Sequence, residues 1–247
     1  MKPIANSQGR GIYLTRDFKT IRQTPGDQLV VQRYIHKPFL IDGFKFDLRI
    51  YVLVYGCDPL RIFTFREGLA RFATEKYVPP FSDNMDNVFM HLTNYAINKK
   101  SEKFNKAADL EDQTGSKRSV SYVLKHIQDN VRGQTVDKLW KSIDEIIVKT
   151  MISAQPKLEN KYRACFPHDT ENSICFEVLG FDIFIDDQVK LWLLEINSLI
   201  SLETNSPLDK KIKSDLINET FKIINFDPEK KAKLKKEMKE KKETLKQ

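Results

Sequence analysis

Hydrophobic and polar residues alternate along much of the first 75 residues, with the period of two that β-strands show. The alternation is clearest over residues 46–54, where one face carries five apolar side chains: Phe46, Leu48, Ile50, Val52 and Val54. Residues 61–65 follow across Cys57-Asp58-Pro59 and are expected to form the hairpin partner of this strand. Shorter strands are predicted over residues 10–14 and 29–35.

The pattern changes in the middle of the chain. Residues 98–118 are polar and broken by Asn, Asp, Gly and Lys, so they predict a long loop followed by two helices. In one of these, apolar residues from Val136 to Met151 recur at i, i+3 and i+4, which predicts a core-facing helix that ends ahead of Pro156. A last amphipathic helix is expected from about Asp209 to Ile224, with Asp227-Pro228 ending the folded part.

A second hairpin is predicted between these helical segments. Strands over residues 175–185 and 189–197 are joined by Asp186-Asp187-Gln188, a turn-forming sequence. Strands separated along the chain from helices are typical of an α+β fold with a mostly antiparallel sheet and packed helices.

Composition limits the class of protein. A chain of 247 residues with 40% hydrophobic residues can bury the core of one large domain or two small ones. No apolar run approaches the ~20 residues of a membrane helix, and the first residues lack the apolar stretch of a secretory signal. The three cysteines lie far apart without CxxC spacing, which argues against a zinc site or a disulfide framework and fits the cytoplasm.

The net charge of +7 comes mostly from one end of the chain. Nine lysines and four glutamates give residues 229–247 a charge of +5, so the rest carries only +2. Nucleic-acid binding needs the positive charge on the folded surface, so this distribution argues against it. Residues 227–247 are therefore expected to be a basic tail, helical or disordered, which could also attract an acidic partner.

Charged residues interrupt the apolar strands at positions that share a face. Lys45, Asp47 and Arg49 lie opposite the apolar side of their strand, where a solvated sheet face alone would explain them. If the second turn spans residues 186–189, Asp182 lies opposite Leu193 and has Glu195 as its diagonal neighbour.

Two carboxylates and the nearby amide of Asn197 would then converge among apolar residues, which favours a Mg²⁺ site shared with substrate phosphates. A surface hairpin with another turn geometry is the alternative.

Two further features carry little weight alone. Gly9-Arg10-Gly11 fits a simple turn as well as a phosphate-binding loop. A single histidine such as His91 is usually structural.

Taken in order, seven blocks of sequence resemble the tubulin–tyrosine ligase-like enzymes: residues 2–3 with 9–14, 31–35, 42–49, 65–68, 91–95, 180–182 and 194–197. The resemblance implies an ATP-grasp-like fold and a reaction that joins an amino acid to a protein carboxylate, mostly on tubulin. It also implies that residues 1–226 are the rear, central and C-terminal part of such a catalytic domain, without the family's N-terminal domain.

The resemblance assigns roles to the matching positions. It implies that the adenine pocket is lined by Gln32, Arg33, Tyr34 and Ile35. It implies that Lys2 and Lys45 contact the ATP phosphates and that Asp47 lies on the nucleotide side of the site. It also implies that the nucleotide and the acceptor are bordered by His91, Thr93 and Asn94. It implies that Mg²⁺ is bound by Asp182, Glu195 and Asn197. It also implies that Lys45, Arg49 and Arg66 are catalytic, with the two arginines binding the carboxylate or acyl-phosphate.

The expected chemistry is phosphorylation of a carboxylate by ATP, followed by attack of an amine on the acyl-phosphate. Residues 94–99, 115–117 and 206–213 most resemble the glutamylating branch, so free glutamate is the expected donor, with glycine or tyrosine as alternatives. The expected partner is the acidic C-terminal tail of tubulin. The expected protein is a monomer of the cytoplasm and cytoskeleton, with the cilium or basal body as candidate places, and contacts neither membrane nor nucleic acid.

One departure separates this chain from the family pattern. Ser198-Leu199-Ile200-Ser201-Leu202 follows the last metal-side residue, and Ile200 stands where the family usually carries proline. Together with the missing front of the domain, this leaves an alternative function, a non-catalytic tubulin- or microtubule-binding protein.

Overall fold

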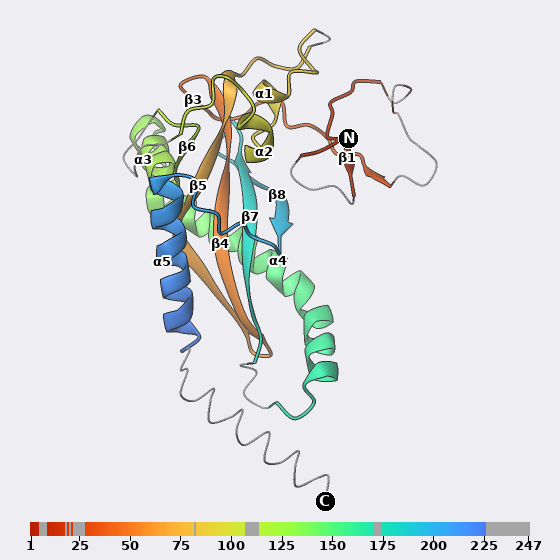
Figure 1. Ribbon diagram of the computed structural model, residues 1–247, viewed down its shortest axis with the longest axis vertical. Coiled ribbons are helices and arrows are strands. Elements are labelled where there is room, and N and C mark those ends of the chain that lie inside the picture. Colours follow the sequence, from red (N-terminus) through yellow and green to blue (C-terminus); the bar gives the residue numbers. More distant parts are fainter. Residues whose placement is uncertain are drawn as a thin grey trace, which may run out of the picture.

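The fold is an α+β arrangement built on one antiparallel sheet, as the sequence predicts (Figure 1). The computed structural model describes residues 1–4, 9–17, 19, 21, 28–81, 83–106, 114–169 and 174–225. Within these ranges the main sheet has the strand order β6-β5-β4-β7-β8, and β3 pairs with β4. The bounds of these strands are Lys117–Ser119 (β6), Leu60–Lys76 (β5), Phe44–Cys57 (β4), Phe176–Ile185 (β7), Leu191–Asn197 (β8) and Leu40–Ile41 (β3).

The two predicted hairpins form the centre of this sheet. β4 pairs with β5 on one side and with β7 on the other, so residues about 130 positions apart in sequence lie in adjacent strands. Both strands of the first hairpin are longer than the alternating pattern suggests. A register shift lies between the pairs Ile50↔Gly68 and Val52↔Thr64. At Gly68 a Cβ would stand 2.4 Å from the backbone oxygen of Arg49, so only glycine allows the strands this approach.

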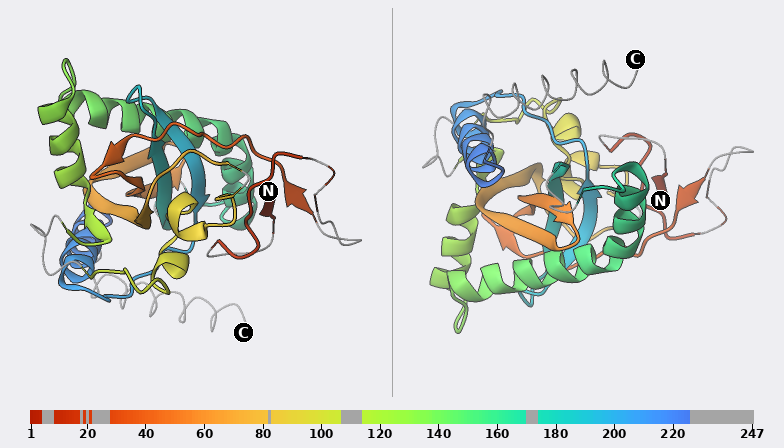
Figure 2. Two further views of the ribbon diagram at one scale, coloured as in Figure 1. Left: turned by 90° about the horizontal axis from the view of Figure 1, so that it is seen from above. Right: turned by 90° about the horizontal axis from the view of Figure 1, so that it is seen from below.

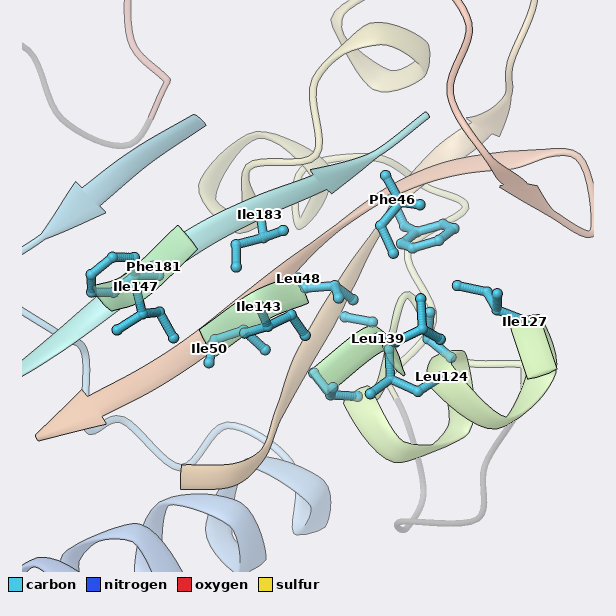
Figure 3. Packing of buried hydrophobic residues seen from close by; sticks show 14 of the residues in the cluster. Phe46, Leu48, Ile50, Leu124, Ile127, Leu139, Ile143, Ile147, Phe181 and Ile183 are labelled. Atoms are coloured by element: carbon cyan, nitrogen blue, oxygen red, sulfur yellow. The ribbon is translucent and has the colours of Figure 1, made fainter. Parts of the chain in front are cut away.

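One face of the sheet carries the main hydrophobic core (Figure 3). The apolar side of β4 packs there against helices α3 (Val120–Asn130) and α4 (Val136–Cys165). Leu48 and Ile50 meet Ile143 and Ile147 of α4, all of them fully buried. The helical periodicity of α4 therefore matches the strand alternation of β4, and both bury their apolar side chains in one layer.

Helix α4 continues through Pro156, so the prediction that it ends ahead of that residue is wrong. Proline has no N–H to bond the carbonyl of Ile152 one turn earlier. That part of the helix faces solvent, with Ile152 itself exposed, so water can satisfy the carbonyl.

Helix α5 (Pro207–Ile223) covers the opposite face of the sheet, as the two end-on views show (Figure 2). Its residues Leu208, Ile212 and Leu216 pack on Tyr51 of β4 and Leu69 of β5. Ser206 caps the helix by accepting a hydrogen bond of 3.1 Å from the N–H of Asp209. The short helices α1 (Val88–His91) and α2 (Tyr95–Asn98) lie at one end of this face (Figures 1 and 2). Asp47 and Arg49 therefore point toward the side that holds these three helices.

Several expectations for the less regular parts need correction. Residues 10–14 form no strand, and the strand predicted over residues 29–35 is only Leu29–Val30 (β2). β2 pairs with Lys2–Pro3 (β1) in a small separate sheet. The predicted loop over residues 98–118 contains the start of β6, which extends the main sheet beside β5. The tail over residues 227–247, with Asp227-Pro228, lies outside the described residues.

Among the described helices, none combines the length and the apolar composition needed to cross a bilayer.

Candidate functional site

A cavity of about 170 Å³ opens near the end of the sheet that carries α1 and α2. It lies between the segment Met1–Lys2, residues 12–14, residues 32–35, residues 91–94 and the strands of the main sheet. All the residues predicted to bind the nucleotide line it: Lys2, Gln32, Arg33, Tyr34, Ile35, Lys45, Asp47, His91, Thr93 and Asn94. Asp182 and Glu195, two of the three predicted metal ligands, line it as well.

A buried hydrogen-bond chain runs along one wall of this cavity. The ammonium of Lys45 donates to the backbone oxygen of His91 at 2.6 Å and to the hydroxyl of Tyr34 at 3.1 Å. Nε2 of His91 lies 3.1 Å from the carbonyl oxygen of Asn84 and must donate to it. In neutral His91, Nδ1 is therefore the acceptor for the Tyr34 hydroxyl at 3.2 Å. Burial lowers the pKa of His91, and nearby Lys45 lowers it further, which favours this neutral form.

Lys45 carries a positive charge whose pKa lies close to physiological pH. Burial lowers its pKa to about 8, although the negative charge of Asp47 raises it in part. Burial likewise raises the pKa of Tyr34, so its hydroxyl stays protonated. The hydrogen-bond partners of the Lys45 ammonium, the Tyr34 hydroxyl and the His91 carbonyl, are both neutral, so this positive charge can bind an anionic ligand.

Below the cavity, two arginines hold two buried carboxylates. Arg71 of β5 donates through Nε to Asp47 at 2.8 Å and pairs with Asp182 at 2.7 Å. Arg49 donates through Nε to Asp182 at 2.5 Å and through a terminal nitrogen at 3.1 Å. Burial alone would raise the pKa of Asp182, but Arg71 and Arg49 outweigh it and bring the pKa to about 2. Asp182 is therefore an anion across the physiological range.

Arg71 is a site residue that the sequence analysis missed. It lies directly opposite Asp47 because β5 contains the register shift near Gly68. The available signal was the charge of Asp47, which needs a partner once its strand is buried. Which β5 residue supplies that partner depends on the shift, and strand alternation does not encode the shift.

Arg66, by contrast, does not reach the cavity. It forms a two-pronged ion pair with Asp144 of α4, at 3.0 and 2.8 Å, and its guanidinium lies 5.0 Å from the ring centre of Trp140. These partners belong to the helix on the other face of the sheet, and the Arg66 side chain is 56% exposed. The sequence indicated this orientation, because Arg66 lies four residues after Ile62 in the same strand and therefore on the same face of the sheet. The side chain of Ile62 packs against the main core.

The predicted metal ligands converge, although by a different pairing. Asp182 lies directly opposite Glu195, not Leu193, because a register shift separates it from the pair Ile183↔Leu193. Asn197 faces Gly180 on the next pair, and its amide nitrogen lies 3.4 Å from Asp182 and 3.5 Å from Glu195. The diagonal contact expected from the turn is thus a direct one, and the three side chains share a face.

These three residues present oxygen donors that suit a hard divalent cation. Glu195 also accepts a hydrogen bond from Lys2. In the described residues no cluster of three His, Cys, Asp or Glu side chains forms a complete metal cage. Two carboxylates and one amide therefore fit Mg²⁺ only if further ligands, such as phosphates or water, complete the shell.

The cavity also fits a nucleotide-like ligand by its chemistry. Apolar side chains of Ile12, Ile35 and Leu92 line it together with Lys2 and Lys45, so it can receive a flat apolar group joined to an anion. The Tyr13 hydroxyl is fully buried and has no hydrogen-bond partner among the residues that the structure describes. Tyr13 lines the cavity with other atoms, so a polar ligand would satisfy this hydroxyl only after a shift of the groups that cover it.

The Gly9-Arg10-Gly11 segment forms a turn. Gly9 and Gly11 have φ values of +77° and +73°, which favour glycine. A Cβ at Gly9 would lie 2.7 Å from Ile97 and 3.0 Å from Asn94, so the turn packs directly on α2. Gly9 therefore lies against Asn94, one of the residues that line the cavity.

Comparison with known proteins adds a relationship over the whole described region. A family model named "Tubulin-tyrosine ligase family" matches residues 1–234. Human tubulin polyglutamylase TTLL6 is 50% identical over 226 residues, which are 92% of this chain and 24% of that protein. A probable beta-tubulin polyglutamylase of Tetrahymena thermophila is 51% identical over 227 residues, or 91% and 19% of the two chains. The chain thus spans about a quarter or less of the length of these two relatives.

Proposed function

This chain belongs to the tubulin-tyrosine ligase family, and from that membership we propose that it provides the nucleotide and metal site of a tubulin glutamate ligase. The reaction would be ATP- and Mg²⁺-dependent and would add glutamate to glutamate side chains in the C-terminal tails of tubulin. The observation that carries the proposal is the cavity, which gathers the nucleotide-binding and carboxylate residues expected from the resemblance out of distant parts of the chain.

The proposal includes an ATP-grasp-like architecture, which the arrangement of the two sheets supports. The antiparallel main sheet, the small β1–β2 sheet and the cavity between them would enclose a nucleotide from two sides. Residues 32–35 would then border the adenine, and Lys2 and Lys45 would contact the phosphates. Mg²⁺ would be held by Asp182, Glu195 and Asn197, with phosphate oxygens completing its shell.

The residues of the chain would act mainly through fixed charge. When bound, Mg·ATP supplies the phosphoryl group that turns a carboxylate into a better electrophile. Lys45 keeps an ammonium in the cavity below pH 8, the region of its lowered pKa. Arg49 is bonded through two nitrogens to Asp182, just outside the cavity lining, and would turn its remaining guanidinium nitrogen to a carboxylate or phosphate. Charges fixed before the reaction stabilise developing negative charge without reorganisation.

Arg71 joins this group and replaces Arg66 in it. It is buried between Asp47 and Asp182 and so fixes both carboxylates in the cavity floor. We assign no catalytic role to Arg66, because its partners lie on the opposite face of the sheet.

Glutamate is the proposed donor because both relatives are named as polyglutamylases. The acidic tubulin tail is the proposed acceptor, and the cytoplasmic cytoskeleton, including the cilium or basal body, is the proposed place of action. A monomer suffices for this chemistry, because the proposed ligands all come from one chain.

Mg²⁺-dependent ATP binding to the full 247-residue chain tests the proposal. We expect Glu195→Gln to weaken it by about tenfold or more, because a charged metal ligand is lost. Glu177→Gln is the matched control, since Glu177 is an exposed carboxylate on β7 outside the cavity. Incorporation of labelled glutamate into a tubulin-tail peptide then tests the activity. Equal ATP affinity in all three proteins, or no ATP binding in any, would contradict the proposed site.

A further inference from the structure

Gly180 lies in β7 at the centre of the charged face. It pairs with Tyr51 of β4 on one side and with Asn197 of β8 on the other. Asp182 follows two residues later, so both residues belong to the same face of the sheet.

The missing side chain of Gly180 is filled by Arg49. A Cβ at position 180 would lie 2.9 Å from Cδ of Arg49, 3.1 Å from Nε and 3.2 Å from Nη1. The stem and guanidinium of Arg49 therefore run over the glycine, against its backbone, before they reach Asp182. A methyl group at this position would have to push the arginine away from the sheet.

Backbone conformation does not explain the glycine. The positive-φ residues of the described chain do not include Gly180, so its backbone suits any L-residue. What the position requires is space. Gly68 differs in this respect, because its Cβ would meet the backbone oxygen of Arg49 and not its side chain.

The space matters because Arg49 has one well-defined arrangement there. Its two hydrogen bonds to Asp182 are parallel, and its side chain is only 15% exposed. Asn197, opposite Gly180, brings its amide to the same carboxylate. A displaced guanidinium would lose the two-pronged geometry and crowd Asn197 as well.

We propose that Gly180 is a positioning residue: its missing side chain leaves the space in which Arg49 forms its two hydrogen bonds to Asp182. Through Arg49 it sets where the proposed carboxylate or phosphate of the substrate meets a guanidinium. This role in catalysis rests on the proposed function, whereas the contact between Gly180 and Arg49 does not.

A double-mutant cycle on stability tests the contact. We expect Gly180→Ala to shift the unfolding equilibrium toward the unfolded state by about tenfold, and to have little effect in an Arg49→Ala background. Gly180→Val should cost more than Gly180→Ala with Arg49 present. Gly133→Ala is the control: a Cβ there is strained by the φ of +83° but meets nothing within 4 Å, so its cost should be the same in both backgrounds.

Ligase assays on the same variants of the 247-residue chain test the consequence. Gly180→Ala should lower kcat by about tenfold, as expected when a charged donor is misplaced. If Gly180→Ala lowered stability equally with and without Arg49, the proposal would be overturned. A Gly180→Ala variant with the stability and turnover of the wild type would overturn it as well. A wild-type chain without ligase activity would refute the proposed function, and the stability cycle would still decide whether Gly180 makes room for Arg49.

Discussion

Arg71 of β5 forms an ion pair with Asp182 of β7 at 2.7 Å, although β4 lies between their two strands. The guanidinium reaches across because Asp47, on β4, is its direct cross-strand partner and holds it over the sheet. Two buried carboxylates from neighbouring strands thereby share one cation, and Arg49 supplies the second positive charge at Asp182. The floor of the cavity is a network of charges spanning three strands, and each member depends on the others.

Replacing Arg71 with Gln should destabilise the protein strongly. Asp47 and Asp182 would share a buried site with Arg49 as the one remaining arginine of the network, and breaking a buried ion pair costs about 3–5 kcal/mol. The free energy of unfolding in urea measures this loss. Arg66→Gln is the control, because its pair with Asp144 is exposed and worth about 0–1 kcal/mol. Similar losses in the two variants would contradict the network.

ATP affinity should decline above pH 8. Lys45 has a pKa of about 8 in the folded protein, so its phosphate-binding charge is present below that pH and lost above it. The dissociation constant should rise by up to about tenfold per pH unit above 8. Calorimetric titration from pH 7 to pH 9.5 measures the slope. Lys45→Met should bind weakly at every pH with a flatter profile, and an unchanged slope in this variant would assign the effect to another group.

The deprotonation of Lys45, which should weaken ATP binding, should affect the free energy of unfolding in the opposite direction. Between pH 8 and its ordinary pKa of 10.5, Lys45 binds fewer protons in the folded than in the unfolded protein. Its contribution to the free energy of unfolding therefore increases as pH rises through this range. Urea unfolding of wild type and Lys45→Met at pH 7.5 and 10 isolates the contribution. A wild-type gain no larger than that of the variant would count against the lowered pKa.

Tyr13→Phe should separate stability from binding. Removing a buried hydroxyl without a partner relieves a desolvation cost of about 1–3 kcal/mol, so the ligand-free protein should gain stability. ATP binding should weaken at the same time, by several-fold, if a ligand supplies the missing partner. Thermal unfolding and calorimetry measure the two effects. Tyr162→Phe is the control, since that hydroxyl donates to Asp169 and its loss should only destabilise.

Asn98→Ala should loosen the cavity wall formed by residues 92–94. The side-chain oxygen of Asn98 accepts hydrogen bonds from the backbone N–H and the hydroxyl of Thr74 in β5. Its side-chain NH₂ donates hydrogen bonds to the backbone oxygens of Leu92 and Asn94. Truncation leaves these buried groups unpaired, at about 1–3 kcal/mol for each group that water does not reach.

Hydrogen exchange should accelerate at the amide of Thr74, which loses its partner in Asn98→Ala. Asn130→Ala, which removes an exposed contact to His126, should change stability by less than about 0.5 kcal/mol. Unchanged exchange at Thr74 would show that Asn98 does not tie β5 to this wall.

Local pattern was enough for the strands that carry the site. Lys45, Asp47 and Arg49 do share the face opposite the apolar side of β4, because alternation along a strand needs no knowledge of its neighbours. The apolar stripe of α4 likewise faces the core as its period predicts. Where a pattern was weak, as over residues 10–14, no strand formed, since a strand also needs a partner to satisfy its backbone.

Partners across strands could not be obtained in this way. Arg71 instead of Leu69 faces Asp47, and Glu195 instead of Leu193 faces Asp182, because each hairpin contains a register shift. Such a shift depends on how closely two strands approach, as at Gly68, and it leaves only a faint trace in either strand alone.

The sequence by itself determined which side chains point to each face of the sheet, because that information is local and repeats every two residues. The tertiary structure alone decided which of them meet. It placed β7 beside β4, turned Arg66 toward Trp140, and laid Arg49 over Gly180. These contacts join residues far apart in the chain and depend on strand order, register and the space left by a missing side chain.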